Sequence, residues 1–151
     1  MMKKPRKKSP AKKKPKAPQR SKGYALQRTT VQGNGDLKFL SWDGVELETL
    51  NPLLQRQLIC GKNVMLARVL LKKGCIVPMH SHVNEQLAYV IDGALKFLID
   101  GKEIVVRAGQ VLTIPPNMPH QAEALEDTVD LDIFNPPRAD WLEKRDSYLR
   151  K

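Results

Sequence analysis

The sequence of 151 residues predicts an all-β domain built as an antiparallel sandwich or barrel. From Val64 onward, short runs rich in β-branched, aliphatic and aromatic residues are separated by turns that contain glycine. Two Asp-Gly pairs stand between such runs, and a strictly alternating stretch follows near the end of the chain. Short strands at this spacing are typical of sandwiches and barrels. A chain of this length forms one core, so we look for one functional site.

The first part of the chain is a basic tail. Residues 1–22 hold 11 of the 26 Lys and Arg and none of the 16 Asp and Glu, which leaves 15 basic against 16 acidic residues in the remainder. The tail has no large apolar side chains to offset the entropy of ordering it. We therefore expect a disordered Lys/Pro-rich tail at 1–23 and a folded domain at 24–151. The tail would add weak, nonspecific attraction to nucleic acid.

The location of the protein follows from what the sequence lacks. No stretch has the pattern of a secretory signal, and none is apolar over the length of a membrane span. We therefore expect a cytoplasmic protein without membrane contact. Cys60 and Cys75 form neither a CxxC pair nor a disulfide framework, and we expect both to be free thiols.

Five central strands are expected, and they are residues 64–71, 86–91, 94–99, 103–107 and 110–114. Asp92-Gly93 and Asp100-Gly101 lie between strands. Each pair predicts a two-residue hairpin turn, because Asp and Gly tolerate the positive φ that such a turn requires. The region before residue 58 is less regular, and LKFLSWDGVELETL, residues 37–50, predicts one or two edge strands.

The stretch TVDLDIF, residues 128–134, alternates as a strand does. One face is apolar and the other is mostly acidic; the first carries Val129, Leu131 and Ile133, and the second carries Asp130, Asp132 and Phe134. The apolar face leaves a surface for a partner to cover, so we expect a homodimer.

The end of the chain, ADWLEKRDSYLRK, predicts a short helix. Trp141, Leu142, Tyr148 and Leu149 fall on roughly one helical face. We expect this helix to dock on the outside of the barrel.

The three histidines of the chain stand in one pattern. His80, His82 and Gln86 share a face if their stretch is a straight strand. The prolines of residues 115–119 exclude a central strand and predict a stiff loop that delivers His120. An isolated histidine is often only a surface or hydrogen-bonded group, but three imidazoles and an amide oxygen suit one divalent transition metal such as Zn, Ni, Mn or Fe. Alternatively, Gln86 orients an imidazole without binding the metal.

Two motifs carry a family resemblance. GCIVPMHSHVNEQLAYVIDG resembles the first motif of the cupin superfamily, G-x5-H-x-H-x3-E-x6-G, with Gln86 where Glu is usual. GQVLTIPPNMPH resembles the second motif, G-x5-P-x-G-x2-H, with Asn117 at the second glycine. The resemblance implies that residues 24–151 are one cupin domain. Its fold would be a double-stranded β-helix, the jelly-roll barrel, followed by the short C-terminal helix.

A narrower resemblance is to the small single-domain cupins of pectin and alginate breakdown, which linearise 4,5-unsaturated uronates. It rests on HSHVNEQ, on the PPNMPH loop and on DIFNPPRADWL, where Asn135 replaces a common Ser. The metal ligands that it implies are His80, His82, Gln86 and His120. The functional Asp, Phe and Arg of that family fall on Asp132, Phe134 and Arg138.

The resemblance implies a metal-dependent, isomerase-like enzyme whose substrate is a sugar acid. Asp132 is the candidate general acid and base, although alternation alone favours a solvated strand carboxylate. Arg138 would bind the carboxylate of the sugar through its planar fork, or else pair with Asp140 or Glu143. Phe134 would form an apolar wall against the sugar ring, or belong to the core.

Two other functions fit the same motifs, because cupins host many unrelated activities. One is a cupin dioxygenase of an unknown small molecule, since three histidines with open metal positions also bind oxygen. The other is a noncatalytic cupin, either a sensor or a nucleic-acid-associated protein that uses the basic tail. Oxygen dependence and metal identity distinguish the first from the uronate enzyme. Duplex-DNA binding by full-length and tail-deleted protein tests the second, and tight, tail-independent binding would contradict the uronate assignment.

Overall fold

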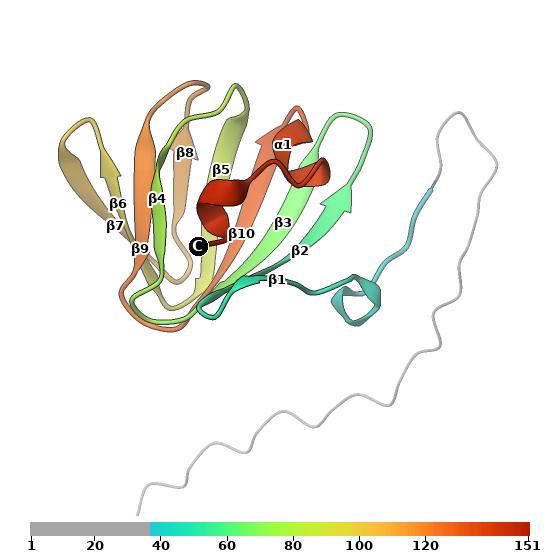
Figure 1. Ribbon diagram of the computed structural model, residues 1–151, viewed down its shortest axis with the longest axis horizontal. Helices are drawn as coiled ribbons and strands as arrows, with labels where there is room; N and C mark the ends of the chain where they lie inside the picture. The colour runs from blue at the N-terminus through green and yellow to red at the C-terminus, as the bar shows by residue number, and fades with distance from the viewer. Residues whose placement is uncertain (1–36) are drawn as a thin grey trace, which may run out of the picture.

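The computed structural model describes residues 37–151, so the tail predicted at 1–23 lies outside the described residues. Ten strands form two facing antiparallel sheets (Figure 1). The six-stranded sheet has the order β1-β2-β3-β10-β5-β8, and the four-stranded sheet has the order β4-β9-β6-β7. The strands are β1 Glu48–Asn51, β2 Leu54–Cys60, β3 Met65–Leu71, β4 Ile76–His80, β5 Glu85–Asp92, β6 Ala94–Ile99, β7 Lys102–Arg107, β8 Val111–Ile114, β9 His120–Ala124 and β10 Thr128–Asn135. The predicted jelly-roll barrel is therefore confirmed.

Alternation along β3 places the core between the sheets. Every second residue from Met65 to Leu71 is buried, and the residues between them are half-buried. The buried side chains pack against apolar residues of the opposite sheet, among them Leu95, Phe97 and Ala122. β1 is the edge strand that residues 37–50 predicted, and a short 3-10 helix, Trp42–Gly44, precedes it.

The two Asp-Gly pairs have different roles. Asp100 and Gly101 have φ of 50° and 70° and join β6 to β7, which pair from Ile99 with Lys102; this hairpin is confirmed. Asp92-Gly93 is not a hairpin turn, because β5 belongs to the six-stranded sheet and β6 to the four-stranded one. At Gly93 the chain crosses from one sheet to the other.

The amphipathic pattern predicted that the C-terminal segment docks on the outside of the barrel, and this prediction is wrong. The segment forms one helical turn, α1 Ala139–Leu142, and a 3-10 helix, Ser147–Leu149, rather than a continuous helix. Figure 1 shows this red segment crossing the opening between the sheets, in front of β10. Trp141 and Leu149 are buried in the core, whereas Leu142 is exposed. The apolar side chains therefore close the barrel.

Ion pairs hold this segment to β1 and β2. The guanidinium of Arg56 is completely buried and pairs with Asp146 at 2.5 Å and with Glu48 at 2.9 Å. Arg150 pairs with the same two carboxylates, at 2.8 Å and 2.6 Å respectively. The four side chains form one network across the end of the barrel.

Two further expectations concern the cysteines and the membrane. Cys60 and Cys75 are both free, as expected. Within residues 37–151, no helix is long and apolar enough to cross a membrane.

We predict that Gly93→Ala is more destabilising than Gly101→Ala. Both glycines have positive φ, but a Cβ at Gly93 would lie 2.5 Å from the carbonyl oxygen of Asp127, whereas one at Gly101 meets no atom within 4 Å. Urea titration should show a loss of about 1–2 kcal/mol in the free energy of unfolding for Gly101→Ala, and about 2–5 kcal/mol for Gly93→Ala because overpacking adds to the backbone strain. Equal losses would contradict the close crossing at Gly93.

Candidate metal centre

The structure brings the three histidines together from two strands and a connection. β4 ends at His80 and β5 begins at Glu85, so His82 lies between the strands. The condition of one straight strand, under which His80, His82 and Gln86 would share a face, is therefore not met. His120 opens β9 and is the register partner of His80. The nitrogen ligand atoms of the three histidines all lie within 4.8 Å of one another. The predicted convergence is therefore confirmed, and the cluster is compatible with a metal site.

A backbone hydrogen bond joins the two motifs. The N–H of Asn117 donates to the carbonyl oxygen of His82 at 2.7 Å. Asn117 has a φ of 63°, a left-handed conformation that Asn tolerates better than most residues, which explains why it can stand where the cupin motif has glycine. The proline-rich loop is thus tied to His82 and delivers His120 beside it.

The backbone selects the tautomer of all three imidazoles. A carbonyl oxygen only accepts hydrogen bonds, so a ring nitrogen that faces one must carry the hydrogen. Each Nδ1 faces such an oxygen; the pairs are His80 with Pro78 at 2.8 Å, His82 with Asn84 at 3.0 Å and His120 with Met118 at 2.8 Å. Each Nε2 is left with its lone pair free, as metal-binding histidines require.

The side-chain oxygen of Gln86 faces the histidine cluster. Nε2 of Gln86 donates to Oδ1 of Asp132 at 2.6 Å, which fixes the amide so that Oε1 lies 3.1 Å from Nε2 of His82. Because that nitrogen carries no hydrogen in the selected tautomer, two lone-pair donors stand side by side. Neighbouring ligands of one metal ion have this arrangement, so the residues present fit the divalent metal that the motifs imply.

Burial keeps these imidazoles neutral. It lowers the pKa of His80 to about 4, and repulsion from His120 adds to the effect. It also lowers the pKa of His82 to about 4, with a further contribution from the charge of Arg138. The pKa of His120 is lowered too, again mainly by burial. Metal binding at neutral pH would therefore displace no proton from Nε2.

The acidic face of β10 points into the barrel. Asp132 is only 7% exposed, so it is not a solvated strand carboxylate. Burial raises the pKa of Asp132 to about 6, although hydrogen bonds from Gln86 and Asp130 act in the opposite direction. The outward residues of this strand, Val129, Leu131 and Ile133, are half-buried. A buried carboxyl group with a raised pKa at a cavity suits proton transfer.

Arg138 is almost completely buried and uses most of its donors inside the protein. Nε and Nη2 donate to Asp140 at 2.9 Å and 2.7 Å, and Nη2 also donates to the hydroxyl of Tyr148 at 3.0 Å. The predicted alternative, a salt bridge to Asp140, is therefore present, and Glu143 pairs with Arg145 instead. Nη1 of Arg138 has no partner among the described residues.

Phe134 belongs both to the core and to the wall of the site. Its ring is buried and lies edge to face with His82, at 5.5 Å between ring centroids, and with Trp141 at 5.1 Å. The guanidinium of Arg138 lies 5.3 Å from the centre of the same ring. Both interpretations of this residue are compatible with its position.

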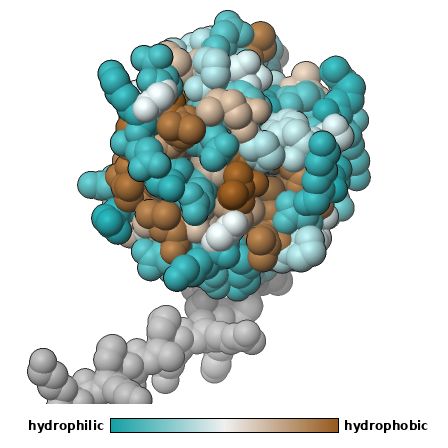
Figure 2. Space-filling view, turned by 60° about the vertical axis from the view of Figure 1, so that its left-hand side comes forward, coloured by the Kyte–Doolittle hydropathy of each residue, from teal (hydrophilic) through white to brown (hydrophobic). Residues whose placement is uncertain are grey.

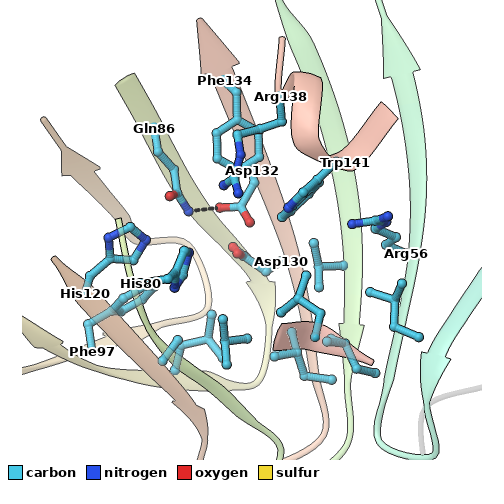
Figure 3. A pocket seen from close by; sticks show the side chains of 18 residues that line it. Arg56, His80, Gln86, Phe97, His120, Asp130, Asp132, Phe134, Arg138 and Trp141 are labelled. Carbon is cyan, nitrogen blue, oxygen red and sulfur yellow. Dashed lines mark hydrogen bonds between the residues drawn. The ribbon is translucent and has the colours of Figure 1, made fainter. Parts of the chain in front are cut away.

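These side chains surround one small cavity (Figure 3). Its volume of about 50 Å³ accommodates a few water molecules. Polar groups line one part, and they are His80, His120, Gln86, Asp130, Asp132, Arg56 and Arg138. The remaining wall is apolar and includes Leu54, Val69, Leu95, Phe97 and Leu149.

Comparisons with known proteins agree with this architecture. The family model described as a cupin domain matches residues 67–135. The pectin degradation protein KdgF of Dickeya dadantii strain 3937 is 31% identical over 103 residues, which are 66% of this chain and 94% of the relative. The chain belongs to the cupin family.

Two solved cupin structures are similar to it. An RmlC-like cupin from Shewanella frigidimarina NCIMB 400 has a TM-score of 0.65 and 28% identity, over 68% of this chain and 94% of that one. KdgF from a Halomonas species also has a TM-score of 0.65, with 26% identity over 69% of this chain and 97% of that one.

Sequence reasoning missed Tyr148 as a neighbour of the cluster. The C-terminal segment of this cupin stacks the Tyr148 ring on His80, with the centroids 4.9 Å apart and the planes 29° apart. Asp130 was expected on the acidic face, but its place beside Asp132 in the cavity was not. Alternation had already put Asp130 and Asp132 on one face, whereas no local pattern marked Tyr148.

We predict that this cupin binds one divalent transition metal per chain through the cluster. Binding to the folded state alone stabilises it, by about 2.7 kcal/mol at a metal concentration one hundred times Kd. Zn²⁺ or Ni²⁺ should therefore raise the Tm of the wild type, and a chelator should reverse the rise. His120→Ala should abolish the effect, while Asp127→Asn, a change of an exposed carboxylate, should retain it. An equal rise in His120→Ala would place the metal elsewhere.

Proposed function

We propose that this cupin is a metal-dependent enzyme that opens the ring of 4,5-unsaturated uronic acid monosaccharides to 4-deoxy-5-keto uronates, in pectin or alginate breakdown. The observation that carries the proposal is the hydrogen bond between Gln86 and Asp132, which sets a buried carboxyl group beside the histidine cluster. The relationship to a pectin degradation protein supports the same class of substrate.

The reaction moves one proton within the sugar. The anomeric hydroxyl loses its proton, the bond from C1 to the ring oxygen breaks to leave an aldehyde, and the enolate takes a proton at C4 and becomes a ketone. The histidine cluster and Gln86 would hold a divalent metal, which would supply positive charge for the developing enolate oxygen. Asp132 takes the proton from the anomeric hydroxyl and returns one at C4. Such positioned proton transfer contributes about 10²–10⁴-fold in rate.

Arg138 and Phe134 bind the sugar. Nη1 of Arg138 is a free charged donor beside the cavity, so it pairs with the uronate carboxylate while Asp140 holds the other edge of the guanidinium. The ring of Phe134 offers an apolar surface to the sugar. Together they place the substrate between Asp132 and the histidine cluster.

We predict that the protein accelerates ring opening of 4,5-unsaturated galacturonate, which is measured as the loss of the ultraviolet absorbance of its enol. Metal-loaded wild type should accelerate the loss over a protein-free blank, which is required because the substrate also opens spontaneously. Asp132→Ala should lose about 10²-fold or more in kcat because proton transfer is removed. Asp127→Ala is the matched control on the surface and should keep the wild-type rate.

Comparison with the protein-free blank also gives the outcome that would contradict the proposal. If the protein binds metal but gives no acceleration, the uronate reaction is wrong, and oxygen consumption with iron-loaded protein then tests the dioxygenase alternative.

We also propose that the enzyme works as a homodimer through the outer face of its six-stranded sheet. Half-buried or exposed apolar side chains cover that face on β5 and β10; they are Leu87, Tyr89, Ile91, Val129, Leu131 and Ile133. On the face in Figure 2, by contrast, hydrophobic residues stand in small groups among hydrophilic ones. Contiguous apolar surface favours an interface between subunits.

Sedimentation tests the dimer. Wild type should sediment as a dimer, and Ile91→Lys should shift it toward the monomer because a charge would be buried in the interface. Ile104→Lys, a comparably exposed position on the other sheet, should leave the dimer intact. A monomeric wild type would refute the proposed assembly.

A further inference from the structure

Asp130 lies next to the proposed catalytic carboxyl group. It precedes Asp132 by two residues on the inward face of β10 and is 3% exposed. Its carboxyl group lies beside that of Asp132 on the same face of the strand (Figure 3). Figure 3 shows the two groups adjacent in the cavity, with Gln86 on the other side of Asp132. The mechanism above gives Asp130 no role.

The surroundings of Asp130 offer little to stabilise a negative charge beyond a hydrogen bond from the backbone N–H of Leu131. Its register partners on the neighbouring strands are Val69 of β3 and Val90 of β5, both buried. Among the described residues, no N–H or O–H group donates to its Oδ1. Asp132 differs, because its Oδ1 accepts a hydrogen bond from the amide of Gln86. Burying an ionised carboxylate with so few hydrogen-bond donors is costly, so the group stays protonated instead.

The contact between the two carboxyl groups leads to the same conclusion. Two carboxylates repel, and their oxygens form a hydrogen bond only when one group carries a proton. Asp130 has the more apolar surroundings, and burial followed by repulsion from Asp132 raises its pKa well above the ordinary range. The proton therefore resides on Asp130, and an oxygen of Asp132 is the hydrogen-bond acceptor.

We propose that Asp130 is a neutral carboxylic acid that donates a hydrogen bond to Asp132 and, with the amide of Gln86, fixes the direction of that carboxylate. Asp130 is thus a positioning residue. Two donors on Asp132 limit its rotation, so its free lone pairs face the substrate. The catalytic consequence rests on the proposed function, whereas the protonation of Asp130 does not.

Infrared difference spectroscopy tests the protonation independently of activity. Metal-loaded wild type at slightly alkaline pH should show the carbonyl band of a buried, protonated carboxylic acid. Asp130→Asn should remove this band, and the exposed control Asp127→Asn should retain it. A wild type without the band, or a band that persists in Asp130→Asn, overturns the inference whether or not the protein opens uronates.

Kinetics of the holoenzyme test the positioning role. Asn is close to Asp in shape and its amide donates as the neutral acid does, so Asp130→Asn should keep kcat within about 5-fold. Asp130→Leu removes the donor and should lower kcat by about 10²-fold with KM nearly unchanged, while metal stoichiometry stays at the wild-type value. Wild-type kcat in Asp130→Leu, or equal losses in both variants, overturns the role.

The two proposals fail in different ways. If the wild type does not accelerate ring opening, the proposed function fails and the infrared band still decides the state of Asp130. If Asp130→Leu does not fold, Asp130→Glu supplies the kinetic test, because the longer acid can still donate but misplaces Asp132. Its kcat should then fall while the infrared band remains, and an unchanged kcat overturns the positioning role.

Discussion

The hydrogen bond from Gln86 to Asp132 links the two halves of the site. An amide has a donor end and an acceptor end, so donating to Asp132 turns the oxygen of Gln86 toward the histidine cluster. A glutamate, the usual residue of the cupin motif, has no hydrogen to donate and would place a second negative charge against Asp132. The glutamine is therefore explained by the buried acid on β10. In the same way, the neutral state of Asp130 follows from the charge that Asp132 keeps.

The histidine cluster could be predicted because the chemistry of imidazole limits its arrangements. With only three histidines in the chain, two of them a residue apart and the third after a proline-rich loop, few other arrangements satisfy a metal. The path of the backbone that brings the histidines together could not be predicted in the same way. His82 lies outside both strands, and its position depends on the hydrogen bond from Asn117, a contact between distant parts of the chain. Residue types with strong chemical preferences thus predict a site better than strand periodicity predicts how the site is built.

Elsewhere, local patterns predicted elements but not their partners. Asp92-Gly93 and Asp100-Gly101 have the same letters, yet only the second closes a hairpin, because strand pairing depends on the rest of the sheet. Alternation in β10 separated an apolar from an acidic face, but it could not tell that the acidic face lines the cavity inside the barrel. The amphipathic C-terminal stretch likewise predicted burial without specifying the surface. That surface is the barrel opening, so Tyr148 reaches His80.

The ion pairs around Arg56 fix the position of the C-terminal segment more than they stabilise the fold. A buried ion pair often contributes less than an apolar pair of the same volume, because both charges lose their hydration, whereas loss of one partner costs about 3–5 kcal/mol. A network with Arg56, Asp146 and Glu48 therefore tolerates few alternative placements of the C-terminal segment. Cζ of Arg56 lies 4.6 Å from the centre of the Trp141 ring. Trp141 also contacts Phe134 of the site. The charges at the end of the barrel thus determine the packing against the histidine cluster.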